Sequence, residues 1–203
     1  MFLHREYYAI YLGRSREFEP RVSEMQGEMA KQSGFVAAYT LAYLGNSTRY
    51  LALRMWHRRE DAQAWGRDPW FQSYLQARPA GLYFSPPEIE YYEQIAETHG
   101  DGAPGFVQVL TFSLAAGKAR DFEARERDIG VVCRDQRGFV ERRAFRFLGN
   151  TTKVLVASVW TGYDDRDVAA FSGPLAGFIR ERPLRDLVNG PLLQEFYRVV
   201  DSR

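Results

Sequence analysis

The amino-acid sequence is a tandem duplication. When the chain is compared with itself at a shift of 104 positions, 20 of the first 99 positions carry identical residues without a gap. Ordinary composition gives roughly one match in fifteen by chance, so the two halves share an origin. The matched segments include Gly34-Phe35-Val36 with Gly138-Phe139-Val140, Leu44-Gly45-Asn46 with Leu148-Gly149-Asn150, and Trp56 with Trp160. The chain is therefore predicted to fold as two copies of one unit.

Composition narrows the class of protein. Of the 203 residues, 45% are apolar and 26% are charged, which is typical of a folded globular chain. The formal net charge of +1 provides no electrostatic footprint for nucleic acid or an anionic membrane. The arginine-rich segments, such as Arg142-Arg143 and residues 180–185, are interpreted as solvated faces. Cys133 is the single cysteine and is expected to be a core thiol in a cytoplasmic protein.

The hydrophobic pattern predicts the same succession of elements in each copy, namely strand, helix, two strands, helix and strand. Gly and Asn tolerate positive φ and suit the turn between the two middle strands, while proline stops the second helix. In the first copy the elements are a strand at 2–12, a helix from Ser15, strands at 34–44 and 50–57, a helix from Asp61 to Arg78-Pro79 and a strand after Pro87. In the second they are strands at 106–114, 138–148 and 153–161, a helix around Phe122, a helix from Asp165 to Arg182-Pro183 and a strand after Pro191.

This β-α-β-β-α-β order is the ferredoxin-like arrangement, in which helices cover one face of the sheet. The other sheet face is left bare in each copy. We therefore expect an α+β fold in which the two repeats pack sheet to sheet as an intrachain barrel. The predicted domains are a first repeat at 1–98, a glycine-rich linker at 99–105 and a second repeat at 106–203.

One motif resembles a known family. An apolar strand ending in tryptophan, residues 50–56, precedes a helix that starts near Asp61 and carries Trp65 and Phe71. The second half repeats the pattern from residue 154 to Trp160, with Asp164-Asp165, Phe171 and Phe178 in the helix. This pattern resembles the antibiotic biosynthesis monooxygenase family of dimeric α+β barrels. Members of that family are mostly single repeats that pair as homodimers, so a fused double copy is a departure.

The resemblance implies several activities. Some family members oxidise polyketide-derived aromatic substrates with molecular oxygen and no metal or flavin, and others degrade haem. The oxygenases carry an asparagine four residues before the strand-end tryptophan, where this chain has Ala52 and Val156. The haem-degrading members use a helix histidine at a position that falls on or near Leu75. The resemblance therefore specifies the fold better than the chemistry.

The family site lies between the helices and the covered sheet face. Strand residues in phase with Trp56 should point there, which selects Arg54 on the third strand and His4, Glu6 and Tyr8 on the first. The equivalent positions in the second copy are Ser158, Gln108, Leu110 and Phe112. The first pocket is thus expected to be the more polar one. A histidine beside a carboxylate can act as a general base near neutral pH.

These considerations give a set of candidate site residues. The predicted catalytic residues are His4 as base, Glu6 as its partner and Arg54 as the group that stabilises the substrate anion. The predicted substrate-binding residues are Trp56, Trp65, Tyr8, Tyr74, Trp160, Ser158 and Arg180; the resemblance supplies Arg180. Competing interpretations place Trp56 and Trp160 in the core and His4 with Glu6 on a solvated edge strand. The three histidines and one cysteine offer no metal-ligand spacing.

The predicted function is that of a cofactor-independent monooxygenase acting on an aromatic, polyketide-like or quinol, small molecule with O2. The expected partners are this substrate and oxygen, with no nucleic acid or membrane, and the chain is expected to be a monomeric pseudo-dimer, with further pairing left open. Two alternatives remain: a haem-binding or haem-degrading protein, with haem as the cofactor, and a non-catalytic module that binds a small molecule.

Overall fold

The computed structural model describes residues 1–181 and 184–203. The strands follow a closed antiparallel hydrogen-bonding order, β1-β3-β2-β8-β5-β7-β6-β4, which confirms the predicted α+β barrel class. The first seven elements are β1 (Phe2–Ala9), α1 (Ser15–Met29), β2 (Phe35–Tyr43), β3 (Arg49–Trp56), α2 (Arg59–Gly66), α3 (Pro69–Gln76) and β4 (Glu88–His99). The rest are β5 (Phe106–Ser113), α4 (Ala119–Arg134), β6 (Phe139–Phe147), β7 (Lys153–Trp160), α5 (Tyr163–Phe171), α6 (Pro174–Glu181), a 3-10 turn η1 (Leu184–Asp186) and β8 (Leu193–Ser202).

The duplication is visible in the element bounds. A shift of 104 residues carries β1, β2 and β3 onto β5, β6 and β7 without any change of limits. The irregularity in strand pairing is duplicated as well, between Phe35 and Ala37 in β2 and between Phe139 and Glu141 in β6. The two halves therefore share their backbone register although most of their side chains differ.

The chain forms two compact units, which we describe separately. The first contains Met1–Tyr92 and Arg198–Arg203, and the second contains Glu93–Tyr197. β4 and β8 each begin in one unit and end in the other, and the division into repeats at 1–98 and 106–203 stays a prediction. The predicted linker at 99–105 leads from the end of β4 to β5 within the second unit.

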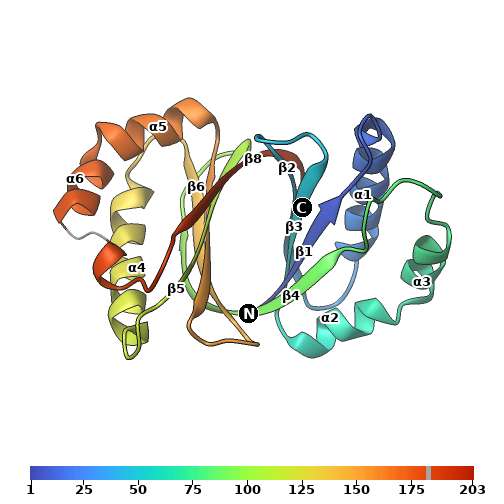
Figure 1. Ribbon diagram of the computed structural model, residues 1–203, viewed down its shortest axis with the longest axis horizontal. Helices are drawn as coiled ribbons and strands as arrows, with labels where there is room; N and C mark the ends of the chain where they lie inside the picture. Colours follow the sequence, from blue (N-terminus) through green and yellow to red (C-terminus); the bar gives the residue numbers. More distant parts are fainter. Residues whose placement is uncertain (182–183) are drawn as a thin grey trace. The chain divides into compact units, whose positions relative to one another are not determined.

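In each unit, helices cover one face of the strands. In the first unit, α1, α2 and α3 lie together beside β1 to β3, and in the second, α4, α5 and α6 lie beside β5 to β7 (Figure 1). The buried stripe of α1 consists of Phe18, Val22, Met25, Gln26 and Met29, which recur at helical spacing. The corresponding stripe of α4 contains Phe122, Glu126, Ile129, Gly130 and Cys133. Each helix thus places a mainly apolar face on its own sheet.

The second helix of each repeat is broken in two. The sequence predicts one helix from Asp61, but α2 ends at Gly66 and α3 starts at Pro69. The Asp68 side chain accepts hydrogen bonds from the backbone N–H groups of Trp70 and Phe71, and proline follows it at the first helical position. This local N-cap outweighs the continuous apolar stripe. In the second half α5 and α6 are separate too; the predicted stop at Arg182-Pro183 lies outside the described residues.

A shared glycine explains how each β2-type strand begins. Gly34 and Gly138 adopt φ of 79° and 72°, and a Cβ atom at either position would collide with the side chain of Asp61 or Asp165 respectively. Both the left-handed backbone and the close approach require glycine. Along the described residues, no helix is both long enough and apolar enough to cross a membrane.

Candidate functional site

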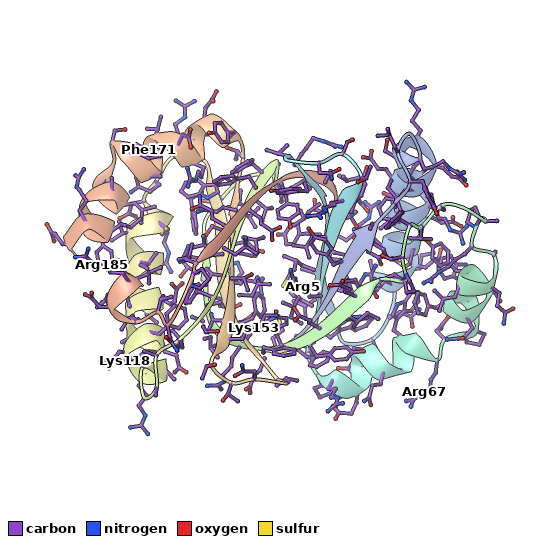
Figure 2. All side chains as sticks on the ribbon, viewed as in Figure 1. Arg5, Arg67, Lys118, Lys153, Phe171 and Arg185 are labelled. Atoms are coloured by element: carbon purple, nitrogen blue, oxygen red, sulfur yellow. The ribbon has the colours of Figure 1, made fainter. Side chains whose placement is uncertain are left out.

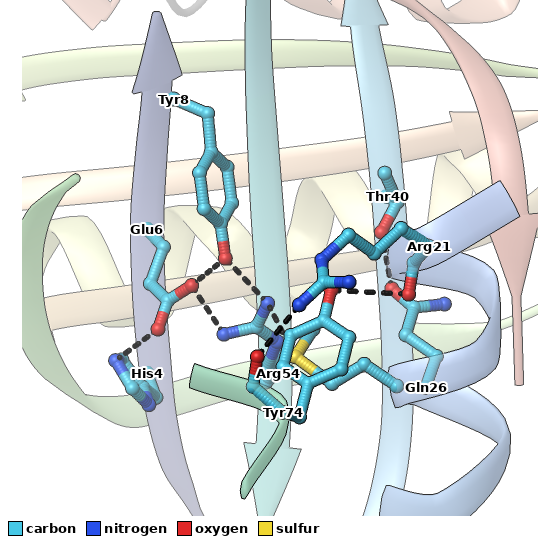
Figure 3. Close-up of polar contacts among 9 residues, drawn as sticks. His4, Glu6, Tyr8, Arg21, Gln26, Thr40, Arg54 and Tyr74 are labelled. Atoms are coloured by element: carbon cyan, nitrogen blue, oxygen red, sulfur yellow. Dashed lines mark hydrogen bonds and ion pairs between the residues drawn. The ribbon is translucent and has the colours of Figure 1, made fainter. Parts of the chain in front are cut away.

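The predicted catalytic residues converge in the first unit. His4, Glu6 and Tyr8 project from β1, and Arg54 projects from the adjacent β3, where it is the direct cross-strand partner of His4. The Glu6 carboxylate accepts hydrogen bonds from the Tyr8 hydroxyl and the Arg54 guanidinium, and His4 Nε2 lies 3.1 Å from Glu6 Oε1 (Figure 3). Arg54 Nη2 also donates to the Tyr8 hydroxyl at 2.7 Å. Strand alternation therefore brings the four polar side chains together.

This cluster is almost fully buried, with Arg54 only 1% exposed and Glu6 only 6%. Burial opposes ionisation of Glu6, but the interactions with Arg54 and His4 outweigh it and lower the pKa of Glu6 to about 2. The carboxylate is thus ionised at neutral pH and balances the buried guanidinium. Such a pair is costly to break, because removal of one partner leaves the other charge uncompensated in the interior.

Aromatic side chains pack around the cluster in the first unit. Trp56, Trp65 and Tyr74 are buried in one apolar core with Tyr8 and Met25. The guanidinium of Arg21 lies 4.2 Å from the centre of the Tyr74 ring (Figure 3). Two hollows of the first unit, of about 520 and 250 Å³, are lined by other residues than His4, Glu6 and Arg54. The structure assembles the predicted residues within a packed interior.

The larger cavity lies in the second unit, between α4, α5, α6 and the sheet. Its volume is about 640 Å³, within the range of pockets for small molecules. Most of its wall is apolar, and Phe171, at its rim, is 72% exposed and projects from α5 (Figure 2). The apolar lining residues are Leu110, Ile129, Trp160, Ala170, Phe171, Leu175, Ile179, Leu184, Leu192 and Phe196. A cavity of this size and lining can hold an aromatic molecule of several rings.

A polar row crosses the sheet at one side of this cavity. Gln108 on β5 is paired with Ser158 on β7, and Ser158 is paired with Arg142 on β6. Arg142 donates to Ser158 Oγ at 2.6 Å and to both carboxylate oxygens of Glu126 at 2.8 and 2.9 Å. Burial works against the charge of Arg142, but Glu126 outweighs burial and raises the pKa of the guanidinium above its usual value. The charge in this row is therefore fixed and internally balanced.

A second guanidinium reaches the cavity from α5. Arg166 Nε donates to Gln108 Oε1 at 3.2 Å, and Arg166 Nη1 donates to Asp167 Oδ1 at 2.7 Å. The ring centre of Phe196 lies 5.0 Å from the guanidinium carbon of Arg166. Tyr163 hydrogen-bonds to Asp167, which raises the pKa of the tyrosine. Among the residues that line the cavity, Asp167 supplies the carboxylate.

The predicted site residues of the second copy are divided between the lining of the cavity and the exposed surface of α6. Trp160 and Ser158 line the cavity, whereas Arg180 is exposed on α6 and is not one of the lining residues. The arginines that line it are Arg142, Arg166 and Arg185. Arg180 lies outside because the lining positions of α6 are Leu175 and Ile179, and Arg180 follows them onto the outward side.

One interpretation of the sequence has to be corrected. Arg142 and Arg143 were expected on a solvated face, but their residues are only 8% and 6% exposed. They lie in the middle of β6, where Arg142 pairs with Glu126 and Arg143 pairs with Glu141. The available signal was position: at the 104-residue shift Arg142 corresponds to Ala38, the direct strand partner of Arg54. Direct strand partners point to the same face of a sheet, so Arg142 could have been assigned to the expected site face of the second copy.

No protein-family model matches the sequence, and no curated protein matches it. Among solved structures, a provisionally named monooxygenase from Fusobacterium nucleatum has a TM-score of 0.83 at 8% identity, covering 100% of this chain and 93% of its own. An anthrone oxidase-like protein has a TM-score of 0.63 at 13% identity, covering 100% and 92%.

A third similar structure is a ferredoxin-fold protein from Listeria monocytogenes that is related to antibiotic biosynthesis monooxygenases. Its TM-score is 0.54 at 11% identity, covering 98% of this chain and 95% of its own. Identities this low establish the fold alone. The chain therefore has the fold of a fused dimeric α+β barrel of the type found among antibiotic biosynthesis monooxygenases.

Proposed function

We propose that the protein is a cofactor-independent monooxygenase that oxidises an aromatic small molecule, polyketide-like or quinol-like, in the cavity of the second unit. The observation that carries the proposal is this cavity of about 640 Å³, whose wall is largely apolar and whose polar lining includes the row of Gln108, Ser158 and Arg142. The shared fold with proteins named as a monooxygenase and as anthrone oxidase-like supports the reaction class.

The chemistry can be written for an anthrone-type methylene group. A proton leaves the methylene carbon, and the carbanion gives electrons to O2 and forms a hydroperoxide. Loss of water then converts CH2 to C=O, so one oxygen atom enters the product and the other leaves in water with both hydrogens. The substrate is itself the reductant. Asp167 is the lining carboxylate that would accept the proton, and the apolar wall would exclude competing water.

The first unit is the second location for the same reaction. His4, Glu6 and Arg54 were predicted as base, partner and anion-stabilising group, and the structure does bring them within bonding distance of one another. Against this, the Arg54 guanidinium is already neutralised by Glu6, and aromatic side chains occupy the surrounding space. We therefore assign the substrate to the second unit, and the catalytic roles predicted for the trio become the alternative that the experiment below tests.

Oxygen consumption tests the proposal and its location together. Purified protein treated with a chelator is mixed with 9-anthrone, and oxygen uptake and anthraquinone formation are followed. We expect one O2 per anthrone and one labelled oxygen atom in the product from 18O2. Arg166→Gln should lower kcat/KM by about tenfold or more, whereas His4→Ala should leave it within about twofold.

Other outcomes point elsewhere. Loss of turnover in His4→Ala and Arg54→Ala with retention in Arg166→Gln would move the reaction to the first unit. A Soret shift when haemin is added, with no anthrone oxidation, would favour the haem-degrading alternative. Tight anthrone binding without oxygen uptake would leave a binding module. Sedimentation of the same samples decides whether the chain works as a monomeric pseudo-dimer or pairs further.

A further inference from the structure

The polar row of the second unit consists of hydrogen-bond donors. Arginine can only donate, so a neutral side chain bonded to it must use its acceptor oxygen. Ser158 Oγ accepts from Arg142, and Gln108 Oε1 accepts from Arg166. The hydroxyl hydrogen of Ser158 and the amide N–H groups of Gln108 are therefore still available to donate to the cavity, while one lone pair on each oxygen is already used. The two guanidinium groups therefore set the direction of their neighbours' donors.

Trp160 adds a third donor to the same wall. It lies two residues from Ser158 along β7, lines the cavity and is 2% exposed. Its indole Nε1–H has no hydrogen-bond partner among the described residues. A buried N–H without a partner costs free energy, and a ligand oxygen at this position would remove that cost. Within the described part of the chain, Trp56 and Trp65 in the first unit also have an indole N–H without a partner, so what distinguishes Trp160 is that it lines the cavity, where a ligand acceptor could reach it.

Several titratable and charged groups surround the row. Glu126 is bonded to Arg142 from behind, and Asp167 is bonded to Arg166, so neither guanidinium carries an uncompensated charge. Burial raises the pKa of the Cys133 thiol to about 11, so this lining group is neutral. The groups that face the row are Glu126 and Cys133 from α4, Arg142 from β6, Tyr163, Arg166 and Asp167 from α5, and Arg185 from η1.

We propose that Gln108, Ser158 and Trp160, oriented by Arg142 and Arg166, form a subsite for an oxyanion attached to an aromatic ring, a phenolate or enolate, and bind it in preference to the neutral hydroxyl form. Three hydrogen-bond donors in the lining of one cavity, two of them bonded to guanidinium groups, stabilise a negative oxygen more than a neutral one. The many apolar and aromatic residues in the rest of the wall favour a ligand whose charged oxygen is attached to an aromatic ring. The inference rests on the proposed function for the place of binding and names the substrate class.

The first unit provides an internal contrast. The corresponding row is His4, Arg54 and Ala38, so the arginine stands one strand away from its position in the second unit. There the charge is neutralised by Glu6, whose carboxylate occupies the place of an anionic ligand. In the second unit the residue at the Glu6 position is Leu110, which lines the cavity. One unit thus contains its own anion, and the other leaves room for an external one.

The test uses 1,8-dihydroxyanthraquinone, which already carries the oxidised ring and cannot be turned over. Its ionisation changes its visible absorbance, so the dissociation constants of the neutral and ionised forms can be measured separately by titration at several pH values under argon. We expect the ionised form to bind at least about tenfold more tightly than the neutral form. The dimethyl ether, which cannot ionise, should bind like the neutral form.

Two variants probe the donors independently. Ser158→Ala and Gln108→Leu should each reduce the preference for the ionised form by about fivefold or more and leave the dissociation constant of the dimethyl ether within about twofold. Ser172→Ala is the matched control, because Ser172 is exposed, donates to Val168 O and does not line the cavity. Gln72→Leu is the control for the glutamine change, since Gln72 is exposed in α3 and bonds to Gly66 O. Ether binding itself reports that each variant is folded.

Three results would overturn the subsite. These are equal affinity for the ionised form and the ether, a preference that survives in both donor variants, and donor-dependent binding of anthracene-2-carboxylate in place of the phenolate. Anthrone oxidation without any preference would leave the proposed function standing and remove this inference. A donor-dependent preference without oxygen uptake would do the reverse, so the two proposals fail separately.

Discussion

The helix-covered faces of the two units share the same strand register but differ in the side chains that pack there. In the first unit Trp65 is buried against Trp70 and Phe71, and the Glu6 carboxylate pairs with Arg54 and accepts a hydrogen bond from Tyr8. At the 104-residue shift Trp65 corresponds to Ala169 and Trp70 corresponds to Pro174, and the second unit encloses about 640 Å³. The two helix pairs therefore differ by two indoles, but neither Ala169 nor Pro174 lines the cavity, which is enclosed by other side chains. The difference teaches that register is inherited by both copies while cavity volume is set by a few side chains.

Replacing Trp65 should give the largest effect, and it tests how tightly the side chains of the first unit pack around this indole. Trp65→Ala should lower the free energy of unfolding by about 3 to 5 kcal/mol, because a buried indole is replaced by a cavity. Urea denaturation measures this loss, and ligand affinity in the second unit should not change. A loss of less than about 1 kcal/mol would show that the first unit is not filled as we describe.

The acid stability of the chain should depend on Glu6, whose position holds Leu110 in the second copy. Its pKa is about 2 in the folded protein and 4.5 ordinarily, so the unfolded state binds the proton more readily. The contribution of Glu6, on the order of 3 kcal/mol, is therefore present above about pH 4.5 and is lost as the pH falls toward 2. Thermal melts across this range should show the loss.

Glu6→Gln should destabilise the protein at pH 7 by a similar amount and flatten the pH dependence below 4.5. The matched control is Glu28→Gln, since Glu28 pairs with Lys31 on the surface of α1. If Glu6→Gln kept the acid-induced loss of stability unchanged, other carboxylates would account for it.

A large side chain placed in the cavity of the second unit should exclude an aromatic ligand from it. Ala170 lies on the cavity-facing side of α5, and Ala170→Trp should weaken the binding of an aromatic ligand by about 100-fold through steric exclusion. Val168→Trp is the control on the same helix, because Val168 is exposed and does not line the cavity. Binding that survives in Ala170→Trp would place the ligand elsewhere.

The smallest expected difference concerns the break in the second helix of each repeat. Asp68 caps α3 through its side chain, whereas its counterpart Ser172 donates to Val168 O. Asp68→Ala should therefore cost about 1 kcal/mol of stability, and Ser172→Ala should cost less than about 0.5 kcal/mol. Chemical denaturation of the two variants side by side checks the ranking; equal losses would contradict the capping assignment.

The fold was open to prediction because its signals are local. Alternating strands, the Gly45-Asn46 and Gly149-Asn150 turns and the proline stops each act within a few residues, and duplication supplied every signal twice. The break at Asp68-Pro69 was missed because the apolar stripe continues across it, and only the capping geometry shows that two helices are present. Strand phase also placed His4, Glu6 and Arg54 on one face.

What the sequence determined by itself is the paired architecture and the polar character of individual strand positions, because both follow from periodicity along the chain. Which unit contains the cavity of about 640 Å³ was decided only in the tertiary structure. Cavity volume depends on how side chains from α4, α5, α6 and the strands meet, and the burial of Arg142 depends on Glu126, which lies 16 residues away in sequence on α4. Such packing depends on contacts between segments that are far apart in the sequence, so a pattern within one short segment does not predict it.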